Sequence, residues 1–101
     1  MKKIINHKLY DTDTAALVAA DRHNMTDRAK YHEEVLYHTR KGAWFMLRRG
    51  GALSIFGGRD GNDRVPTCCI EPITEKAARD FCLAHGEAND YQKYFGELEE
   101  A

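Results

Sequence analysis

The residues best suited to metal chemistry are three cysteines and one histidine in the second half of the chain. Cys82 and His85 are three residues apart, so their side chains would share one face of a helix. Thiolate and imidazole are ligands that zinc prefers, and the Cys68–Cys69 pair on a preceding strand can approach them. Adjacent strand residues point to opposite faces, however, so only one of Cys68 and Cys69 can join, which gives only three ligands. We therefore predict no structural metal and expect these cysteines to pack in the interior.

The glycine-rich segment 57–66 matches no known phosphate or calcium loop. It lacks the Lys-Ser/Thr pair that ends a Walker A loop. Its Asp60-Gly61-Asn62-Asp63 run also lacks the alternating ligands and the terminal Glu of an EF-hand. Arg59 and Arg64 can contact an anion, but a surface turn is the simpler interpretation.

The histidines have no accompanying motif for catalysis. Ser54 is the only serine and has no nucleophile elbow around it, and no carboxylate–histidine spacing marks a general base. We therefore predict a non-enzymatic protein with no cofactor and no catalytic residue. A cryptic enzyme or small-ligand sponge, completed by another subunit, is a less favoured alternative. The five histidines are His7, His23, His32, His38 and His85.

Charge is distributed unevenly along the chain. Residues 1–65 carry 12 basic and 8 acidic side chains, whereas residues 66–101 carry 3 basic and 8 acidic ones. This polarity is compatible with one cationic and one anionic face, which would steer a charged partner. The alternative is a last helix that simply ends in a solvated acidic tail. The overall formal charge of −1 argues against a general nucleic-acid binder.

The elements expected to position these residues make an α+β fold, a small antiparallel sheet of two hairpins plus a strand. The first hairpin turns at Asn6-His7, since Asn tolerates the positive φ of tight turns. The second joins strands 34–39 and 43–48 through Gly42. Residues 52–56 form a short strand or one helical turn, and 67–71 a strand that Pro72 ends.

Three helices are expected to pack against this sheet. A short Ala-rich N-terminal helix covers 15–21, behind the cap candidates in 11–14. A second begins after Thr74 and ends at Gly86. The third begins at Asn89 or Asp90 and presents one apolar stripe, Tyr91, Tyr94, Phe95 and Leu98.

Composition predicts one folded domain over residues 1–101. The chain is 43% hydrophobic and 10% aromatic, and an 11.5 kDa chain is expected to fold to a surface of about 5,800 Å², with room for a single core. The short apolar runs predict no membrane span, and the opening Met1–Ile5 has no signal-peptide core. The odd count of three cysteines favours a reducing cytoplasm.

Several segments resemble a family of small proteins carried by phages and plasmids of gut bacteria. The resemblance covers most of the chain and departs from the family at 52–65, where this sequence is richer in Arg and Asp. It carries no catalytic motif and no residue-level role. It implies an accessory protein of a mobile genetic element that opposes host defence, as anti-CRISPR proteins do. The segments are Lys-Leu-Tyr-Asp-Thr-Asp-Thr-Ala at 8–15, the hairpin 34–45, and the segments 71–81 and 91–97.

The leading functional hypothesis is a non-enzymatic inhibitor that binds a bacterial defence complex, such as a CRISPR effector, in the host cytoplasm. A carboxylate-lined face would occupy a cationic nucleic-acid channel of that complex. The acidic candidates are Glu87, Asp90, Glu97, Glu99 and Glu100. The alternative is a small nucleic-acid-binding or regulatory protein that uses the arginine-bearing hairpin and loop. The basic candidates are Arg40, Lys41, Arg48, Arg49, Arg59 and Arg64.

Overall fold

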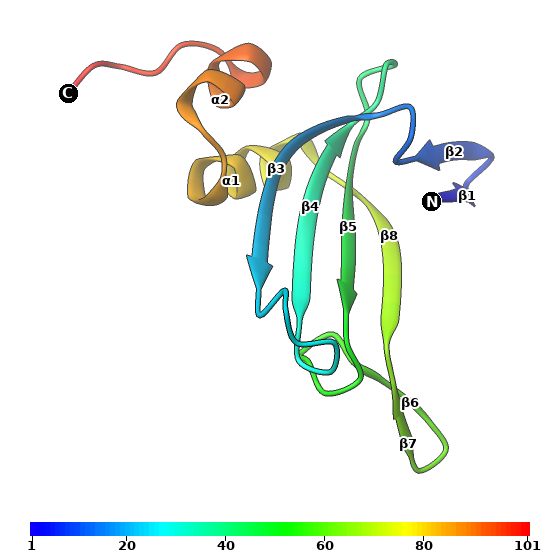
Figure 1. Cartoon of the computed structure of the whole chain (residues 1–101). Coiled ribbons are helices and arrows are strands. Elements are labelled where there is room, and N and C mark those ends of the chain that lie inside the picture. Colours follow the sequence, from blue (N-terminus) through cyan, green and yellow to red (C-terminus); the bar gives the residue numbers. More distant parts are fainter.

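A four-stranded antiparallel sheet with two short helices on one face organises the protein, whose computed structural model describes residues 1–101 (Figure 1). The strand order is β3-β4-β5-β8. Two further hairpins, β1–β2 and β6–β7, are separate two-stranded sheets. The predicted place of the first hairpin in the main sheet is therefore wrong, because β3 pairs with β4 there instead. The strands are β1 (Lys2–Ile5), β2 (Lys8–Asp11), β3 (Ala16–His23), β4 (His32–His38), β5 (Trp44–Gly50), β6 (Gly58–Asp60), β7 (Asp63–Val65) and β8 (Thr67–Ile73). The helices are α1 (Glu75–His85) and α2 (Ala88–Phe95).

The β4–β5 hairpin is the centre of the sheet, as its sequence predicts. Aromatic and β-branched residues favour pleated strands that pack on both faces, and β5 is buried throughout 44–47. Gly42 in the connecting turn has φ +90°, which favours glycine. Tyr37 pairs with Phe45 and Leu36 with Met46 across the two strands, so successive pairs face opposite sides of the sheet.

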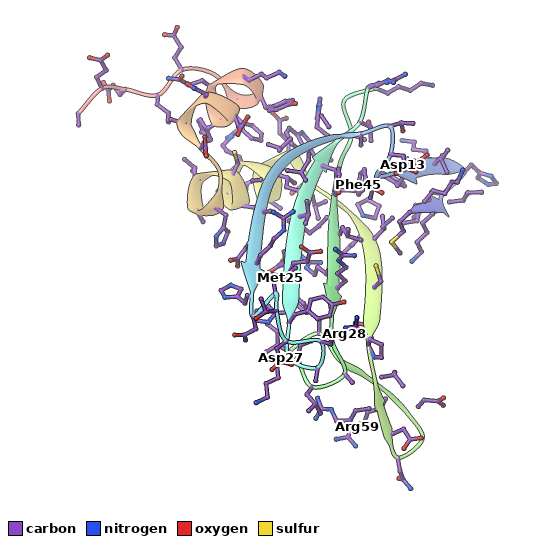
Figure 2. All side chains as sticks on the ribbon, viewed as in Figure 1. Asp13, Met25, Asp27, Arg28, Phe45 and Arg59 are labelled. Atoms are coloured by element: carbon purple, nitrogen blue, oxygen red, sulfur yellow. The ribbon has the colours of Figure 1, made fainter.

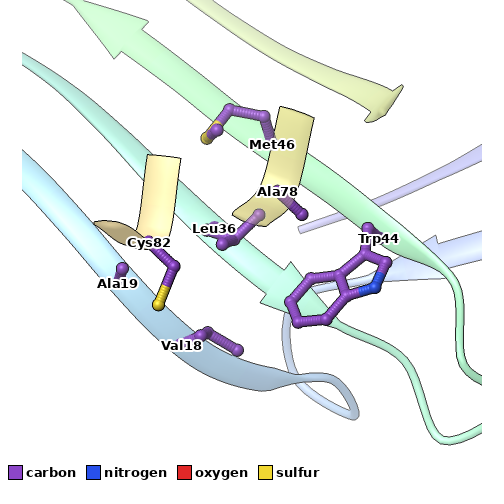
Figure 3. Close-up of a cluster of buried hydrophobic side chains, with 7 residues drawn as sticks. All are labelled: Val18, Ala19, Leu36, Trp44, Met46, Ala78 and Cys82. Carbon is purple, nitrogen blue, oxygen red and sulfur yellow. The ribbon is translucent and has the colours of Figure 1, made fainter. Parts of the chain in front are cut away.

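Each face of the sheet carries its own apolar cluster. Under the helices, Leu36, Trp44 and Met46 meet Ala78 and Cys82 of α1 (Figure 3). On the opposite face, Phe45 is fully buried among other apolar side chains, near the β1–β2 hairpin. This second cluster contains Tyr10, Val35, Phe45, Leu47 and Ile70. The two clusters follow directly from the alternation of strand side chains.

Helix α1 begins and ends where the sequence predicts. The Thr74 side chain accepts a hydrogen bond from the Ala77 N–H at 3.1 Å, as an N-cap residue should. Gly86 follows the helix, but its φ is −89°, outside the left-handed region. Glycine is required there for space, because a Cβ would lie only 2.6 Å from the Cys82 sulfur.

Helix α2 differs from its predicted boundaries at both ends. Its N-cap residue is Glu87, two residues before the predicted Asn89, and no side chain caps it. Gly96, with φ +101°, ends the helix before Leu98, which is 40% exposed. The apolar stripe is therefore shorter than expected and consists of Tyr91, Tyr94 and Phe95.

The prediction of an N-terminal helix over 15–21 is wrong, because those residues belong to the edge strand β3 and the turn before it. Asp11 does not cap a helix; its carboxylate accepts from the Asp13 N–H at 2.9 Å and shapes a turn. The alanines instead pair with β4, Ala19 opposite Leu36 and Ala20 opposite Val35. Burial against these two residues outweighs the modest helix preference of alanine.

Three local predictions around the sheet also differ from the structure; they concern residues 52–56, the loop 57–66 and Pro72. Residues 52–56 are neither strand nor helix but consecutive turns, in which Ser54 donates its hydroxyl to the Gly51 carbonyl at 2.8 Å. The loop 57–66 contains the β6–β7 hairpin, with Gly61 at φ +63° in its turn. Pro72 does not end β8, because a proline is tolerated on an edge strand. The Asn6-His7 turn is confirmed, with φ of 51° and 63°.

The molecule is thin and leaves much of its sheet exposed. Its extents are 50 × 37 × 20 Å, and its accessible surface of 7106 Å² exceeds the value of about 5,800 Å² expected for its mass. Only 16 of the 101 residues are buried, because the two small hairpins and the C-terminal tail project from the sheet (Figure 1). Neither helix has the length and apolar character needed to cross a bilayer.

Candidate functional site: an acidic C-terminal surface

The five acidic residues predicted to bind a partner all lie on α2 and the tail that follows it. Glu87 precedes the helix and Asp90 lies in its first turn, half-buried. The other three follow Gly96 in the extended tail and are exposed. We call this set the acidic surface: Glu87, Asp90, Glu97, Glu99 and Glu100.

Aromatic stacking holds α2, which precedes the acidic tail, against the main sheet. The Phe95 ring stacks on Trp44 with a centroid separation of 5.0 Å and an interplanar angle of 18°. Tyr94 meets the same indole edge-on at 5.4 Å and also contacts the His38 ring at 5.0 Å. Because these contacts come from β4 and β5, the helix that carries the carboxylates has a defined position over the sheet.

No carboxylate of the acidic surface takes part in an ion pair. The other three acidic side chains of residues 66–101 do: Glu71 pairs with Arg48, Glu75 with Arg79, and Asp80 with Lys76. Lys93 is the one cation on α2, and its ammonium lies 5.3 Å from the Tyr94 ring centre. The acidic surface therefore carries five negative charges that the chain itself does not neutralise.

The two arginines of β5 form ion pairs with glutamates on opposite faces of the sheet. Arg48 pairs with Glu34 at 2.9 Å and with Glu71, beside the helix-covered cluster. Arg49 points to the other face and pairs with Glu33. Two adjacent strand residues cannot line one surface. The structure therefore does not bring Arg48 and Arg49 together as a basic binding site.

Glu33 is the most buried charged residue of the sheet. Its side chain is 2% exposed and lies between two arginines, with Arg22 Nε donating to Glu33 Oε2 at 2.8 Å and Arg49 donating to the other oxygen. Burial alone would raise the pKa of this carboxyl, but the two arginines outweigh burial and hold it below the ordinary value of 4.5. This three-residue network is structural, because both arginines are used to neutralise one carboxylate.

Two further arginine candidates, Arg59 and Arg64, lie on the β6–β7 hairpin, at the opposite end of the molecule from the acidic surface (Figures 1 and 2). Arg59 and Arg64 face each other across the hairpin, and Asp60 and Asp63 form the next pair. Arg64 donates its Nε to the Ala52 carbonyl at 3.0 Å. The two aspartates balance the two arginines, so this hairpin is not a concentrated basic patch.

Three of the five histidines come together in a way that the sequence does not predict. The two oxygens of Asp21 lie 2.8 Å from His23 Nε2 and 3.7 Å from His85 Nε2. His32 stacks on His23 with 4.6 Å between ring centres. Asp21 and His23 share a face only because β3 is a strand. The cluster can hold two imidazoles in place, but no nucleophile lies in it, since Ser54 is buried and bonded to Gly51.

The cysteines do not converge on His85. Cys68 lies on the face opposite α1, where its thiol is 3.1 Å from the Met1 sulfur, while Cys82 is buried under α1. The expectation that these cysteines pack in the interior holds only for Cys82, because Cys68 and Cys69 are exposed. Burial raises the pKa of the Cys82 thiol above its ordinary value. No group of three or more histidine, cysteine or acidic side chains is arranged to hold a metal ion.

Comparison with known proteins adds no assignment. No protein-family model matches the chain, and neither a curated protein nor a solved structure is significantly similar to it.

Proposed function

We propose that this protein is a non-enzymatic inhibitor that binds a basic surface of a bacterial defence complex, in the manner of an anti-CRISPR protein. The observation that carries the proposal is the acidic surface, whose five carboxylates have no cationic partner within the chain. The resemblance of the sequence to accessory proteins of phages and plasmids suggests the class of partner.

The charge and placement of the acidic surface suit a cationic channel that normally receives nucleic acid. Nucleic-acid channels are lined by Lys and Arg, and a protein carboxylate can replace a phosphate in such contacts. The tail 96–101 extends away from the sheet, so Glu97, Glu99 and Glu100 can enter a groove that the sheet itself cannot. Aromatic anchoring of α2 fixes the base of this tail against Trp44.

The shape of the molecule supports binding rather than turnover. A molecule whose smallest extent is 20 Å, with projecting hairpins, presents area to a partner, and the His23–Asp21–His85 cluster lacks the nucleophile and enclosed pocket of an active site. Arg48 and Arg49 do not support the alternative of a nucleic-acid-binding protein, because they pair with glutamates on opposite faces of the sheet.

The experiment that tests the proposal is capture of the partner by the tagged protein from a lysate of the bacterial host, followed by mass spectrometry. We expect one defence complex to be retained in stoichiometric amount and released by raised salt. The matched bait carries Glu97→Lys, Glu99→Lys and Glu100→Lys, and it should retain much less of the same complex. Equal retention by both baits would exclude the acidic surface from binding, and retention of nucleic acid without protein would favour the alternative.

A further inference from the structure

A cationic groove lies between the N-terminal hairpin and the β4–β5 turn, and no residue of the acidic surface lines it. The hairpin and α2 lie on opposite sides of this turn (Figure 1). Residues of the β1–β2 turn and β2 form one wall, and residues 39–43 form the other. Its volume is about 530 Å³, within the range of small-molecule pockets. Lys8 of the first hairpin lies beside Arg40 and Lys41 in this groove, although the two segments are far apart in the sequence.

The charge of the groove is of one sign. Lys8, Arg40 and Lys41 line it together with His7, and no carboxylate is among its nine lining residues. None of the three permanent cations takes part in an ion pair, whereas Arg22, Arg48 and Arg49 all do. The groove therefore offers up to eleven N–H donors from two ammonium groups and one guanidinium with no internal acceptor.

The neighbouring aspartates are directed elsewhere. Asp11 follows Tyr10 in the chain, but its carboxylate accepts a hydrogen bond from the Asp13 N–H at 2.9 Å. Asp13 is exposed and lies outside the lining. Neither aspartate is therefore among the residues that line the groove.

The turn that carries Arg40 and Lys41 is held by its own hydrogen bonds. The Thr39 N–H donates to the Ala43 carbonyl at 2.9 Å, and the Gly42 N–H donates to the Thr39 carbonyl at 3.0 Å. The Thr39 hydroxyl accepts from the Ala43 N–H at 2.9 Å, which leaves its own proton for a ligand. A fixed turn presents both cations and a hydroxyl donor without a large ordering cost on binding.

The groove also has an apolar component. Leu9 is 57% exposed and lines it, beside Ala43 and the Tyr10 side chain, which packs edge-on against Phe45 at 5.6 Å. Arg and Lys recognise phosphate oxygens, and a tyrosine ring on the same face as Lys8 can pack against a planar ring. A ligand that joins several phosphates to a ring system matches both components.

We propose that this groove binds a nucleoside polyphosphate, with its phosphates on Lys8, Arg40 and Lys41 and its base against Tyr10, which shares the Lys8 face of β2, and Ala43. The proposal is independent of the inhibitor function, because no residue of the acidic surface lines the groove. It assigns a ligand class to a part of the chain that the protein-binding proposal does not use.

The test is a titration of the full-length protein with ATP, followed by amide chemical shifts and calorimetry at about 20 mM salt. Adenosine and inorganic triphosphate are titrated in parallel to separate the contributions of the base and the phosphates. We expect saturable shifts at Leu9, Thr39 and Ala43, with ATP binding more tightly than triphosphate and adenosine binding at least tenfold more weakly than ATP.

The variant Arg40→Glu/Lys41→Glu should weaken ATP binding at least tenfold, and Arg40→Gln/Lys41→Gln should do so with less risk to folding. The matched control is Arg28→Glu/Lys30→Glu, which makes the same change in net charge at the far end of the sheet (Figure 2). Neither control side chain makes a hydrogen bond or an ion pair, so the control should bind ATP within about twofold of wild type.

Three results would overturn the proposal. They are no saturable ATP binding by the wild-type protein, equal losses in the groove and control variants, and shifts confined to residues outside the groove. A fourth result would assign the groove to a second copy of the chain: concentration-dependent self-association, abolished by Arg40→Gln/Lys41→Gln and by loss of the tail glutamates. The first three results leave the partner-capture experiment unaffected, whereas the fourth would show that the tail glutamates bind a second copy of this chain.

Discussion

The indole of Trp44 and the ring of Phe95 stack with 5.0 Å between their centroids and 18° between their planes. Trp44 belongs to the central strand β5 and Phe95 ends α2, immediately before the acidic tail. This contact therefore links the core of the sheet to the surface on which the proposed function depends.

Replacing Phe95 with Ala should loosen α2 without unfolding the sheet. The variant loses the stack on Trp44 and a contact with Tyr91 at 5.3 Å. Phe95 is only half-buried, so we expect a loss of about 2 kcal/mol in the free energy of unfolding. Urea unfolding measures this loss, and hydrogen exchange should show α2 exchanging faster. Gln92→Ala, on the exposed side of the same helix, is the control and should be nearly neutral; a similar loss in both variants would contradict the anchoring role.

Truncation of Phe45 should affect the whole fold. Its ring is fully buried, stacked on Tyr37 at 5.1 Å and edge-on to Tyr10. Phe45→Ala is expected to cost about 3–5 kcal/mol, measured from the urea midpoint. Ile55→Ala removes a side chain that is 76% exposed and should leave the midpoint nearly unchanged. An unchanged midpoint for Phe45→Ala would show that this face of the sheet is not a core.

Glu33→Gln should destabilise the protein and change its response to acid. The amide cannot neutralise Arg22 and Arg49, so we expect a loss of about 2 kcal/mol at pH 7. Glu71→Gln is the control, because Glu71 also pairs with an arginine but is 61% exposed, and it should cost less than about 1 kcal/mol.

The acid response follows from the lowered pKa of Glu33. Stability from this carboxylate is fully present above the ordinary value of 4.5 and is lost as the pH falls through its lower folded-state pKa. Unfolding free energies measured from pH 6 to pH 3 should therefore fall less steeply in Glu33→Gln than in the wild type. Parallel pH profiles would contradict the arginine network as the source of the shift.

His38 should make the protein less stable in mildly acidic solution. Burial beside Trp44 and Tyr94 lowers the pKa of His38 below its ordinary value of 6.5. The unfolded chain then takes up a proton at a higher pH than the folded one, so stability is lost as the pH falls from about 6.5 toward the folded-state pKa. His38→Gln cannot titrate, and its unfolding free energy should vary less between pH 7 and pH 5. An identical decrease in both proteins would assign the effect to other groups.

The parts of the fold that were predictable are those where local preference and tertiary packing agree. The strands around Gly42 are rich in β-branched and aromatic residues and form the centre of the sheet. Thr74 caps α1 because its side chain and the following helix need only local contacts. Strand β3 was not predictable in this way, because the intrinsic preference of its alanines is for a helix. They form a strand only by pairing with Val35 and Leu36 of β4.

In the candidate site, too, only the features that depend on local pattern could be predicted from the sequence. The separation of Arg48 from Arg49 follows from strand alternation and was available from the sequence. The approach of His85 to Asp21 was not, because it depends on α1 crossing a strand that the sequence pattern assigns to a helix. The groove joins Lys8 to Arg40 across about thirty residues, and no local signal relates the two segments. The β6–β7 hairpin does have a local signal, the Gly61 flanked by Asp60 and Asn62.

The most direct test of the inhibitor proposal is the rate at which the captured partner associates with wild-type protein and with Glu97→Lys/Glu99→Lys/Glu100→Lys, at about 20 mM and about 150 mM salt. The control, Asp13→Lys/Asp60→Lys/Asp63→Lys, makes the same change in net charge on carboxylates that form no ion pair and lie away from α2 (Figure 2). We predict that the acidic-surface variant associates at least tenfold more slowly at low salt, that the difference shrinks at high salt, and that the control stays within about threefold of wild type. Equal rates for the wild type and the acidic-surface variant at the low salt concentration would contradict the proposal.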